Sequence, residues 1–253
     1  MKEKLKMFFD TKEFHICMII VIIIAILFVS GIIVLKYNVE GETNLPFKLS
    51  KISVISTIEG NDNDDAENKW NLTVNQNNDI YLYINKNDDY KDTVAIDKIL
   101  INNFAIAQAP KVGEIKLYKP DAGIDATIFR DVAENETASI EYAGDLESSI
   151  KDLKVSNQGG LIVFRYANTN IGKYVSNEDA EINHNDLIKK LNVTNDDIKF
   201  KFAFDIAIKI KSGATYKSNI ELELPVENVV ENGTQSVENT DLSKFIFKRV
   251  NNE

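Results

Sequence analysis

The stretch that decides the fold is Ile198-Lys199-Phe200-Lys201-Phe202-Ala203-Phe204-Asp205-Ile206-Ala207-Ile208-Lys209-Ile210-Lys211. Apolar side chains occupy every even position, and lysine, alanine or aspartate occupies every odd position. A period of two residues is that of a β-strand with one buried face and one wet face. The sequence therefore predicts a long strand here, with its phenylalanine and isoleucine side chains in a hydrophobic core.

A partner strand is predicted from Tyr216 to Leu224, where apolar residues again fall on even positions. Both apolar sets must lie on one face of the hairpin, so the numbers of paired residues must sum to an even value. This excludes a two-residue turn. A three-residue loop, Ser212-Gly213-Ala214, is expected instead. This register places Ile206 opposite Ile220.

Shorter alternating runs predict strands along the rest of the chain. The first run, from Phe47 to Ile58, changes its apolar face near Ser50-Lys51, which indicates a β-bulge. The runs at 70–74 and 80–84 are typical of a β-hairpin whose turn is Asn75-Gln76-Asn77-Asn78. The other predicted strands are 94–106, 114–118, 126–129, 139–142, 150–155, 161–166 and 242–249.

The predicted fold class is all-β. Only residues 185–191 look helical in this region, because Asn185 can cap a short turn with one apolar face. Turn-forming residues near 120 indicate a boundary between two halves, 47–120 and 121–253. We expect an N-terminal transmembrane helix followed by an antiparallel β-sandwich, either immunoglobulin-like or built as two small packed β-sandwiches.

The transmembrane helix is predicted at residues 16–35, which carry no charge. At about 1.5 Å per residue these residues span about 30 Å, the thickness of the hydrocarbon core of a bilayer. Four lysines precede the span and one follows it directly, and the lysine-rich side of a span stays in the cytoplasm. The expected order is a cytoplasmic tail (1–15), the span, a connector (36–46) and an extracellular domain. A cleavable signal peptide is the alternative, but its apolar region is only about 7 to 15 residues long.

The charge of the chain restricts its partners. Without the five lysines and three acidic residues of the first 36, the chain's 29 basic and 39 acidic residues become 24 and 36, a net charge of −12. Such a domain is repelled by polyanions, so we expect no nucleic-acid partner. Cys17 is the one cysteine, so no disulfide can stabilise the sandwich. Lysine outnumbers arginine, and isoleucine and asparagine are abundant, which indicates a low-GC Gram-positive bacterium.

No residue is assigned a catalytic, cofactor-binding or metal-binding role. The acidic loop 59–68 lacks the spacing of a helix–loop–helix calcium site, so a solvated loop is expected. Trp70 is expected in the core, and Gly159-Gly160 in a hairpin turn. His184 is expected to be a surface or capping residue. We therefore expect a protein that is not an enzyme.

Four short runs resemble an uncharacterised family of single-pass membrane proteins from low-GC Gram-positive bacteria. They are Asn44-Leu45-Pro46-Phe47, Gln76-Asn77-Asn78-Asp79-Ile80-Tyr81, Ser156-Asn157-Gln158-Gly159-Gly160 and Phe247-Lys248-Arg249. The resemblance implies membrane anchoring and supplies no activity, ligand or catalytic residue.

The expected function is that of a non-catalytic interaction or scaffold module in the cell envelope. Its expected partners are the lipid bilayer, through residues 16–35, and another envelope protein. The alternative is a carboxylate-dependent hydrolase acting on cell-wall glycans, which would need two acidic side chains about 5 to 9 Å apart.

Overall fold

The computed structural model describes residues 11–64, 69–121, 129–132, 138–144, 152–176, 181–225 and 227–250. The chain divides into two compact units, Met1–Thr43 and Asn44–Glu253. Among the described residues, the first unit contains one long helix and the second contains every strand.

Helix α2 (Lys12–Glu40) forms the first unit. The Thr11 side chain accepts a hydrogen bond from the Phe14 N–H at 3.3 Å and so caps the first turn. Gly41 ends the helix with a positive φ of 73°, a conformation that glycine adopts without strain. The helix from Phe14 to Glu40 is long and apolar enough to cross a membrane. It includes the whole predicted span and extends into both flanking segments.

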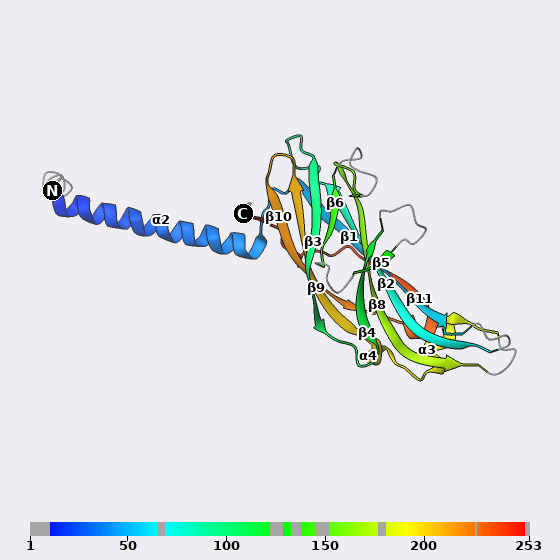
Figure 1. The fold of residues 1–253 in the computed structure, drawn as a ribbon. Coiled ribbons are helices and arrows are strands. Elements are labelled where there is room, and N and C mark those ends of the chain that lie inside the picture. Colours follow the sequence, from blue (N-terminus) through cyan, green and yellow to red (C-terminus); the bar gives the residue numbers. More distant parts are fainter. Residues whose placement is uncertain are drawn as a thin grey trace. The chain divides into compact units, whose positions relative to one another are not determined.

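The second unit is a β-sandwich of two six-stranded sheets (Figure 1). Sheet A contains, in spatial order, β11 (Thr234–Asn239), β1 (Phe47–Asp62), β2 (Asn71–Lys86), β8 (Gly159–Val175), β4 (Glu114–Pro120) and β5 (Phe129–Asp131). Sheet B contains β12 (Lys248–Val250), β10 (Thr215–Leu224), β9 (Phe200–Ile210), β3 (Ile96–Gln108), β6 (Ile140–Ala143) and β7 (Leu153–Lys154). Neighbouring strands are antiparallel except β6 and β7, which are parallel. The all-β prediction is confirmed.

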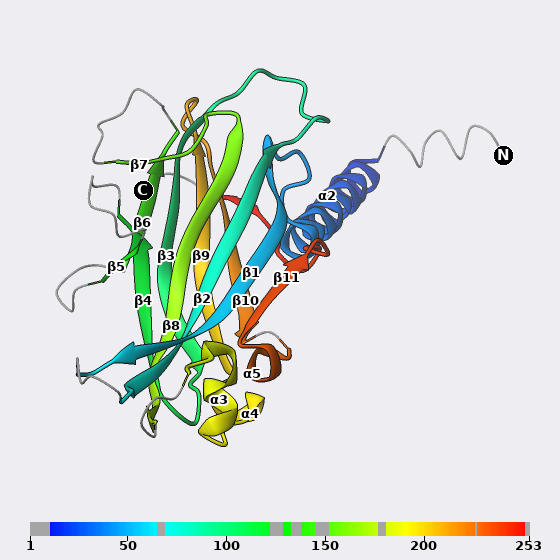
Figure 2. The same ribbon diagram turned by 90° about the vertical axis from the view of Figure 1, so that its right-hand side faces the viewer.

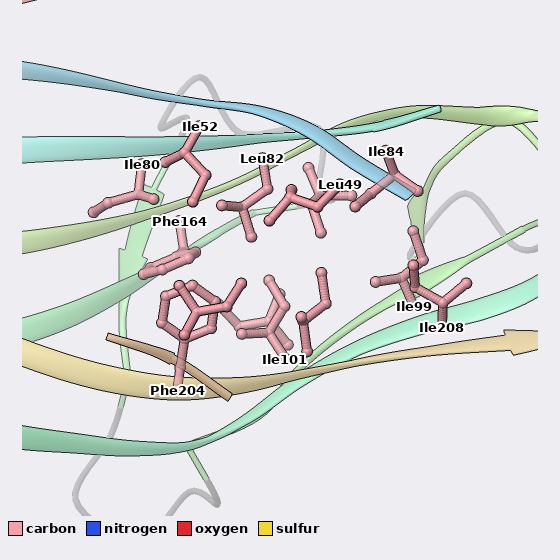
Figure 3. Packing of buried hydrophobic residues seen from close by; sticks show 14 of the residues in the cluster. Leu49, Ile52, Ile80, Leu82, Ile84, Ile99, Ile101, Phe164, Phe204 and Ile208 are labelled. Atoms are coloured by element: carbon pink, nitrogen blue, oxygen red, sulfur yellow. The ribbon is translucent and has the colours of Figure 1, made fainter. Parts of the chain in front are cut away.

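The main core lies between the two sheets. Figure 3 shows Ile80, Leu82 and Phe164 of sheet A pointing toward Ile101 and Phe204 of sheet B. Each side chain comes from the apolar parity of its strand, as the alternation requires. The largest fully buried side chains are Phe47, Phe164, Phe200, Phe202, Phe204, Ile52, Leu72, Ile80, Leu82, Ile84, Ile96 and Ile99.

The β9–β10 hairpin has the predicted parity and loop length, but its predicted register is wrong by two residues. Ile206 pairs with Ser218 rather than with Ile220. The Ile210 N–H donates to the Ala214 carbonyl at 2.9 Å, so the three-residue loop is Lys211-Ser212-Gly213. The last residue of such a loop needs a positive φ, and Gly213 supplies it with a φ of 96°. The predicted loop would have placed an alanine there.

The hairpin predicted at 70–84 is wrong, because β2 is one continuous strand. Asn75 to Asn78 pair with β1 on one side, and Gln76 to Asn78 pair with β8 on the other. Hydrogen bonds to two neighbouring strands override the turn preference of asparagine. The bulge predicted in β1 is confirmed, because the β1–β2 register shifts between Leu49 and Lys51.

The helix predicted at 185–191 is confirmed as a 3₁₀ turn, η1 (His184–Asp186), followed by α3 (Leu187–Lys190). Two further one-turn helices, α4 (Asn195–Ile198) and α5 (Val229–Asn232), were not predicted. Figure 2 shows the three helices gathered at one end of sheet A. There they cover a second hydrophobic cluster made of Ile58, Leu72, Val74, Ile171, Leu187, Ile188, Ile198, Val229 and Val230.

Strands from both sides of residue 120 pair within each sheet. In sheet A, β4 precedes the predicted boundary and pairs with β8, which follows it. In sheet B, β3 precedes the boundary and pairs with β6 and β9. Each sheet therefore contains strands from both predicted halves.

Several predicted strands are shorter or differently placed in the structure. Phe129 opens β5, and positions 126–128 of that predicted strand lie outside the described residues. Positions 150–151 of another predicted strand lie outside them too, and the rest contains the two residues of β7. The last strand forms only at the end of the predicted range 242–249, although Phe247 packs in the main core.

Tyr142 of β6 links the two sheets at one edge of the sandwich. Strand β4 pairs with β8 only as far as Tyr118, opposite Arg165, so β4 does not reach Val163. The Tyr142 hydroxyl donates to the Val163 carbonyl at 2.7 Å and accepts from the Val163 N–H at 3.0 Å. Burial raises the pKa of Tyr142 to about 12, which keeps the hydroxyl proton available for this bond.

We predict that Tyr142→Phe lowers the free energy of unfolding by about 1–3 kcal/mol, because it leaves the part-buried N–H and carbonyl of Val163 without their partner. Urea denaturation of residues 44–253 measures the loss. Tyr174→Phe is the matched control, since the ring of Tyr174 contacts Lys190 Nζ at 4.8 Å and Phe keeps that contact. A loss for Tyr142→Phe no larger than that of the control would contradict the role of the hydroxyl.

Candidate functional site

The outward face of sheet A is apolar at its centre. In β2, Ile80 and Leu82 point into the core, so Tyr81 and Tyr83 must point outward. The same alternation places Leu161 of β8 on the outside, where it is 44% exposed. Both parities therefore carry apolar or aromatic side chains in this part of the two strands, a pattern typical of a sheet that is covered on both faces.

Strand register gathers these outward side chains into one surface, which we call the aromatic face. Tyr83 lies between Lys51 and Leu161 on the neighbouring strands. In the next row along the strands, Tyr81 lies beside Val163. The aromatic face consists of Ile55, Tyr81, Tyr83, Tyr118, Phe129, Leu161 and Val163. Apart from Leu161, all are half-buried among their neighbours.

An ion pair lies within the aromatic face. The Arg165 guanidinium makes two bonds to the Asp79 carboxylate, Nε to Oδ1 at 2.5 Å and one terminal nitrogen to Oδ2 at 3.0 Å. Arg165 Cζ also lies 4.4 Å from the centre of the Phe129 ring. Burial opposes the charge of Arg165, but the bonds to Asp79 raise its pKa above the ordinary value. The arginine is therefore held flat against the face, with its charge neutralised locally.

A second cation lies at the edge of the aromatic face. Lys51 Nζ is 4.2 Å from the centre of the Tyr83 ring and 2.6 Å from a carboxylate oxygen of Glu238 in β11. This lysine and the ion pair give the face a few fixed hydrogen-bonding groups among its aromatic rings. Such a mixture of tyrosine, arginine and apolar side chains is typical of protein interaction surfaces.

The outward face of sheet B has the opposite character. Charged side chains alternate along β9 and β10 and form cross-strand ion pairs, as in Lys201–Glu223 at 2.9 Å. Burial opposes the charge of Asp205, but hydrogen bonds from Asn219, Lys217 and Asn103 lower its pKa. This face is wet, as the alternating sequence predicted for the hairpin.

The acidic loop contains internal hydrogen bonds. Strand β1 extends into it as far as Asp62, whose carboxylate accepts from the Asn71 N–H at 3.3 Å. The Asn71 side-chain amide donates to the Asp64 carboxylate at 2.8 Å. Residues 65–68 of the loop lie outside the described residues. Among the residues that the structure describes, no three histidine, cysteine or acidic side chains form a group that could hold a metal ion.

Trp70 is not a core residue, and that prediction is wrong. Trp70 is 42% exposed, and its backbone N–H donates to the Ser176 hydroxyl at 2.9 Å. Trp70 immediately precedes β2, while Leu72 and Val74, further along the strand, are buried beneath the short helices. The alternation correctly placed Trp70 on the same face as Leu72 and Val74. It could not show where the helices that cover this face end.

His184 has the structural role expected of it, whereas Gly159-Gly160 lie in a turn of another kind than the one predicted. The Gly159 N–H donates to the Ser156 carbonyl at 3.0 Å and closes a turn. This turn leads from β7 in sheet B to β8 in sheet A, so it is not the hairpin turn that was predicted. His184 is exposed, and its Nδ1 accepts from the Gly60 N–H at 3.1 Å.

A cavity of about 630 Å³ lies between the β4–β5 edge of sheet A and the β6–β7 edge of sheet B. Asp121, Glu141 and Asp152 line it together with two cations, Lys119 and Arg130. Burial and the neighbouring Arg130 lower the pKa of Lys119. Glu141 forms an ion pair with Lys98 at 2.7 Å.

The hydrolase alternative would need two of these acidic side chains about 5 to 9 Å apart. It stays a prediction.

No protein-family model, curated protein or solved structure matches this chain.

We predict that Arg165 and Phe129 are energetically coupled by about 0.5–1 kcal/mol, the usual strength of an exposed cation–π contact. A double-mutant cycle of Arg165→Lys and Phe129→Leu, measured by urea denaturation, tests this. Lysine keeps a charge beside Asp79 but cannot lie flat on the ring or bind both carboxylate oxygens. Free-energy losses that add within about 0.3 kcal/mol would contradict the coupling.

Proposed function

We propose that this protein is a membrane-anchored, non-catalytic interaction module of the cell envelope, and that the aromatic face is the surface its protein partner covers. The observation that carries the proposal is the contrast between the two sheets. Sheet B presents ion pairs to solvent, whereas sheet A presents tyrosine, phenylalanine and aliphatic side chains. Apolar side chains gathered on one outer face gain free energy when a partner removes them from water.

The polar groups of the aromatic face suit a protein partner. Tyrosine and arginine are enriched among the residues that dominate binding energy. The Asp79–Arg165 pair is already formed in the free domain, so its side chains lose little conformational freedom on binding. The net charge of −12 outside the first 36 residues disfavours polyanions as partners, as derived above.

The same proposal places the domain outside the cell. Residues 16–35 span the bilayer, the N-terminus lies in the cytoplasm, and residues 37–253 lie outside. The support is the length and apolar character of helix α2 together with the excess of lysine before it. Lysine-rich, isoleucine-rich and asparagine-rich composition supports an origin in a low-GC Gram-positive bacterium.

Site-specific photocrosslinking tests the aromatic face. We predict that benzoylphenylalanine at Tyr83, in the full-length protein in living cells, yields one reproducible protein adduct. The matched control is the same probe at Glu221, which is exposed on the outward face of sheet B and should yield none.

A further substitution separates contact from mere proximity. Leu161→Asp in the Tyr83 probe strain introduces a charge at an exposed position and should abolish the adduct while the urea midpoint of the domain stays unchanged. The proposal fails if the adduct forms equally at Glu221 or survives Leu161→Asp.

Cysteine labelling tests the orientation. In a Cys17→Ser background, we predict that Lys244→Cys reacts with a membrane-impermeant maleimide on intact spheroplasts. Lys6→Cys should react only after lysis, since it precedes the span. The reverse pattern would show that the orientation is inverted.

A further inference from the structure

Polar side chains separate the two hydrophobic clusters on the inward face of sheet A. We call them the polar belt, which consists of Ser56, Gln76, Asn78, Asn168 and Gln235. Register places them together, because Ser56 lies opposite both Asn78 and Gln235, and Gln76 lies opposite Asn168. Gln76, Asn78, Asn168 and Ser56 are fully buried.

The side-chain donors of Ser56, Gln76, Asn78 and Asn168 all form hydrogen bonds. The Ser56 hydroxyl donates to Asn78 Oδ1 at 2.6 Å, and Gln76 Nε2 donates to the same oxygen at 3.0 Å. Asn78 Nδ2 donates to the Tyr166 carbonyl at 3.2 Å, and Asn168 Nδ2 donates to the Val112 carbonyl at 3.0 Å. Neighbouring oxygens therefore hold the side-chain amide nitrogens of Gln76, Asn78 and Asn168 in place.

Three buried oxygens of the belt have no hydrogen-bond donor among the described residues. They are Gln76 Oε1, Asn168 Oδ1 and Gln235 Oε1. Reversing the Gln76 amide would turn its oxygen toward Asn78 Oδ1, and reversing the Asn168 amide would turn its oxygen toward the Val112 carbonyl. Either change would set two acceptors against each other, so the neighbours fix both amides as described.

One of these oxygens, Asn168 Oδ1, lies close against the backbone of Gly113. A Cβ added at Gly113 would lie 2.0 Å from Asn168 Oδ1, and the φ of Gly113 is 85°. Any other residue here would have a strained positive φ and would place its Cβ against Asn168 Oδ1, so only glycine fits at position 113.

We propose that the polar belt is a binding site for ordered water, and that a water molecule bridges Gln76 Oε1 and Asn168 Oδ1. A water molecule supplies two donors, and Gln76 and Asn168 are paired residues on neighbouring strands that each carry one buried oxygen without a donor. The belt contains no carboxylate, so it lacks the charge that a divalent cation requires of its ligands. The site is independent of the aromatic face, which lies on the other side of the sheet.

Residues 44–253 suit the test because both hydrophobic clusters are formed within them, and this unit is compact on its own. A crystal structure at a resolution that shows ordered water should contain a density peak at about 2.7–3.2 Å from both Gln76 Oε1 and Asn168 Oδ1. In Gln76→Met, which lacks the acceptor, the peak should be lost. Gln108→Met makes the same exchange at an exposed strand position and should retain it.

The proposal is overturned if the wild-type map shows no peak between the two oxygens, or shows protein donors bonded to them. A peak that persists in Gln76→Met would overturn the bridging role. A peak surrounded by six or more oxygen ligands would identify a cation and would also contradict the proposal. If Gln76→Met does not fold, the wild-type map decides the matter alone.

Discussion

The burial of phenylalanine and isoleucine side chains between sheets A and B is the interaction on which the rest of the structure depends. Phe164 of sheet A meets Phe204 of sheet B edge to face, with ring centres 5.1 Å apart. Each fully buried side chain of this kind contributes about 1.5–3 kcal/mol relative to an exposed one. Cys17 is the only cysteine and lies in helix α2, so no disulfide assists the sandwich.

Apolar periodicity was sufficient to predict the all-β class, the main strands and the bulge in β1, because each of these follows from which face of a strand is buried. It could not set the β9–β10 register, which Gly213 decides through its backbone conformation. It also misread Asn75 to Asn78, whose turn preference is local, whereas the neighbouring strands that override it are distant in sequence. Trp70 shows the same limit, since parity says nothing about where a covering helix ends.

The aromatic face could have been found from the sequence by one signal. Tyr81 and Tyr83 stand between buried residues of β2, so both parities are apolar or aromatic in that part of the strand, and Leu161 repeats the pattern in β8. A strand with two apolar faces needs a cover on each. The core supplies one cover for sheet A, and the proposed partner supplies the other. The polar belt could not be found in this way, because Asn168 and Gln235 come from strands far in sequence from the β1 and β2 residues that they join.

Hydroxyl-radical footprinting of the full-length protein tests the central claim most directly, by comparing native membranes with purified protein. A partner on the aromatic face should lower the oxidation of Tyr81 and Tyr83 in native membranes and leave Tyr90, in the loop after β2, unchanged. Equal oxidation of Tyr81 and Tyr83 in both samples would contradict the claim that this face is covered in the cell.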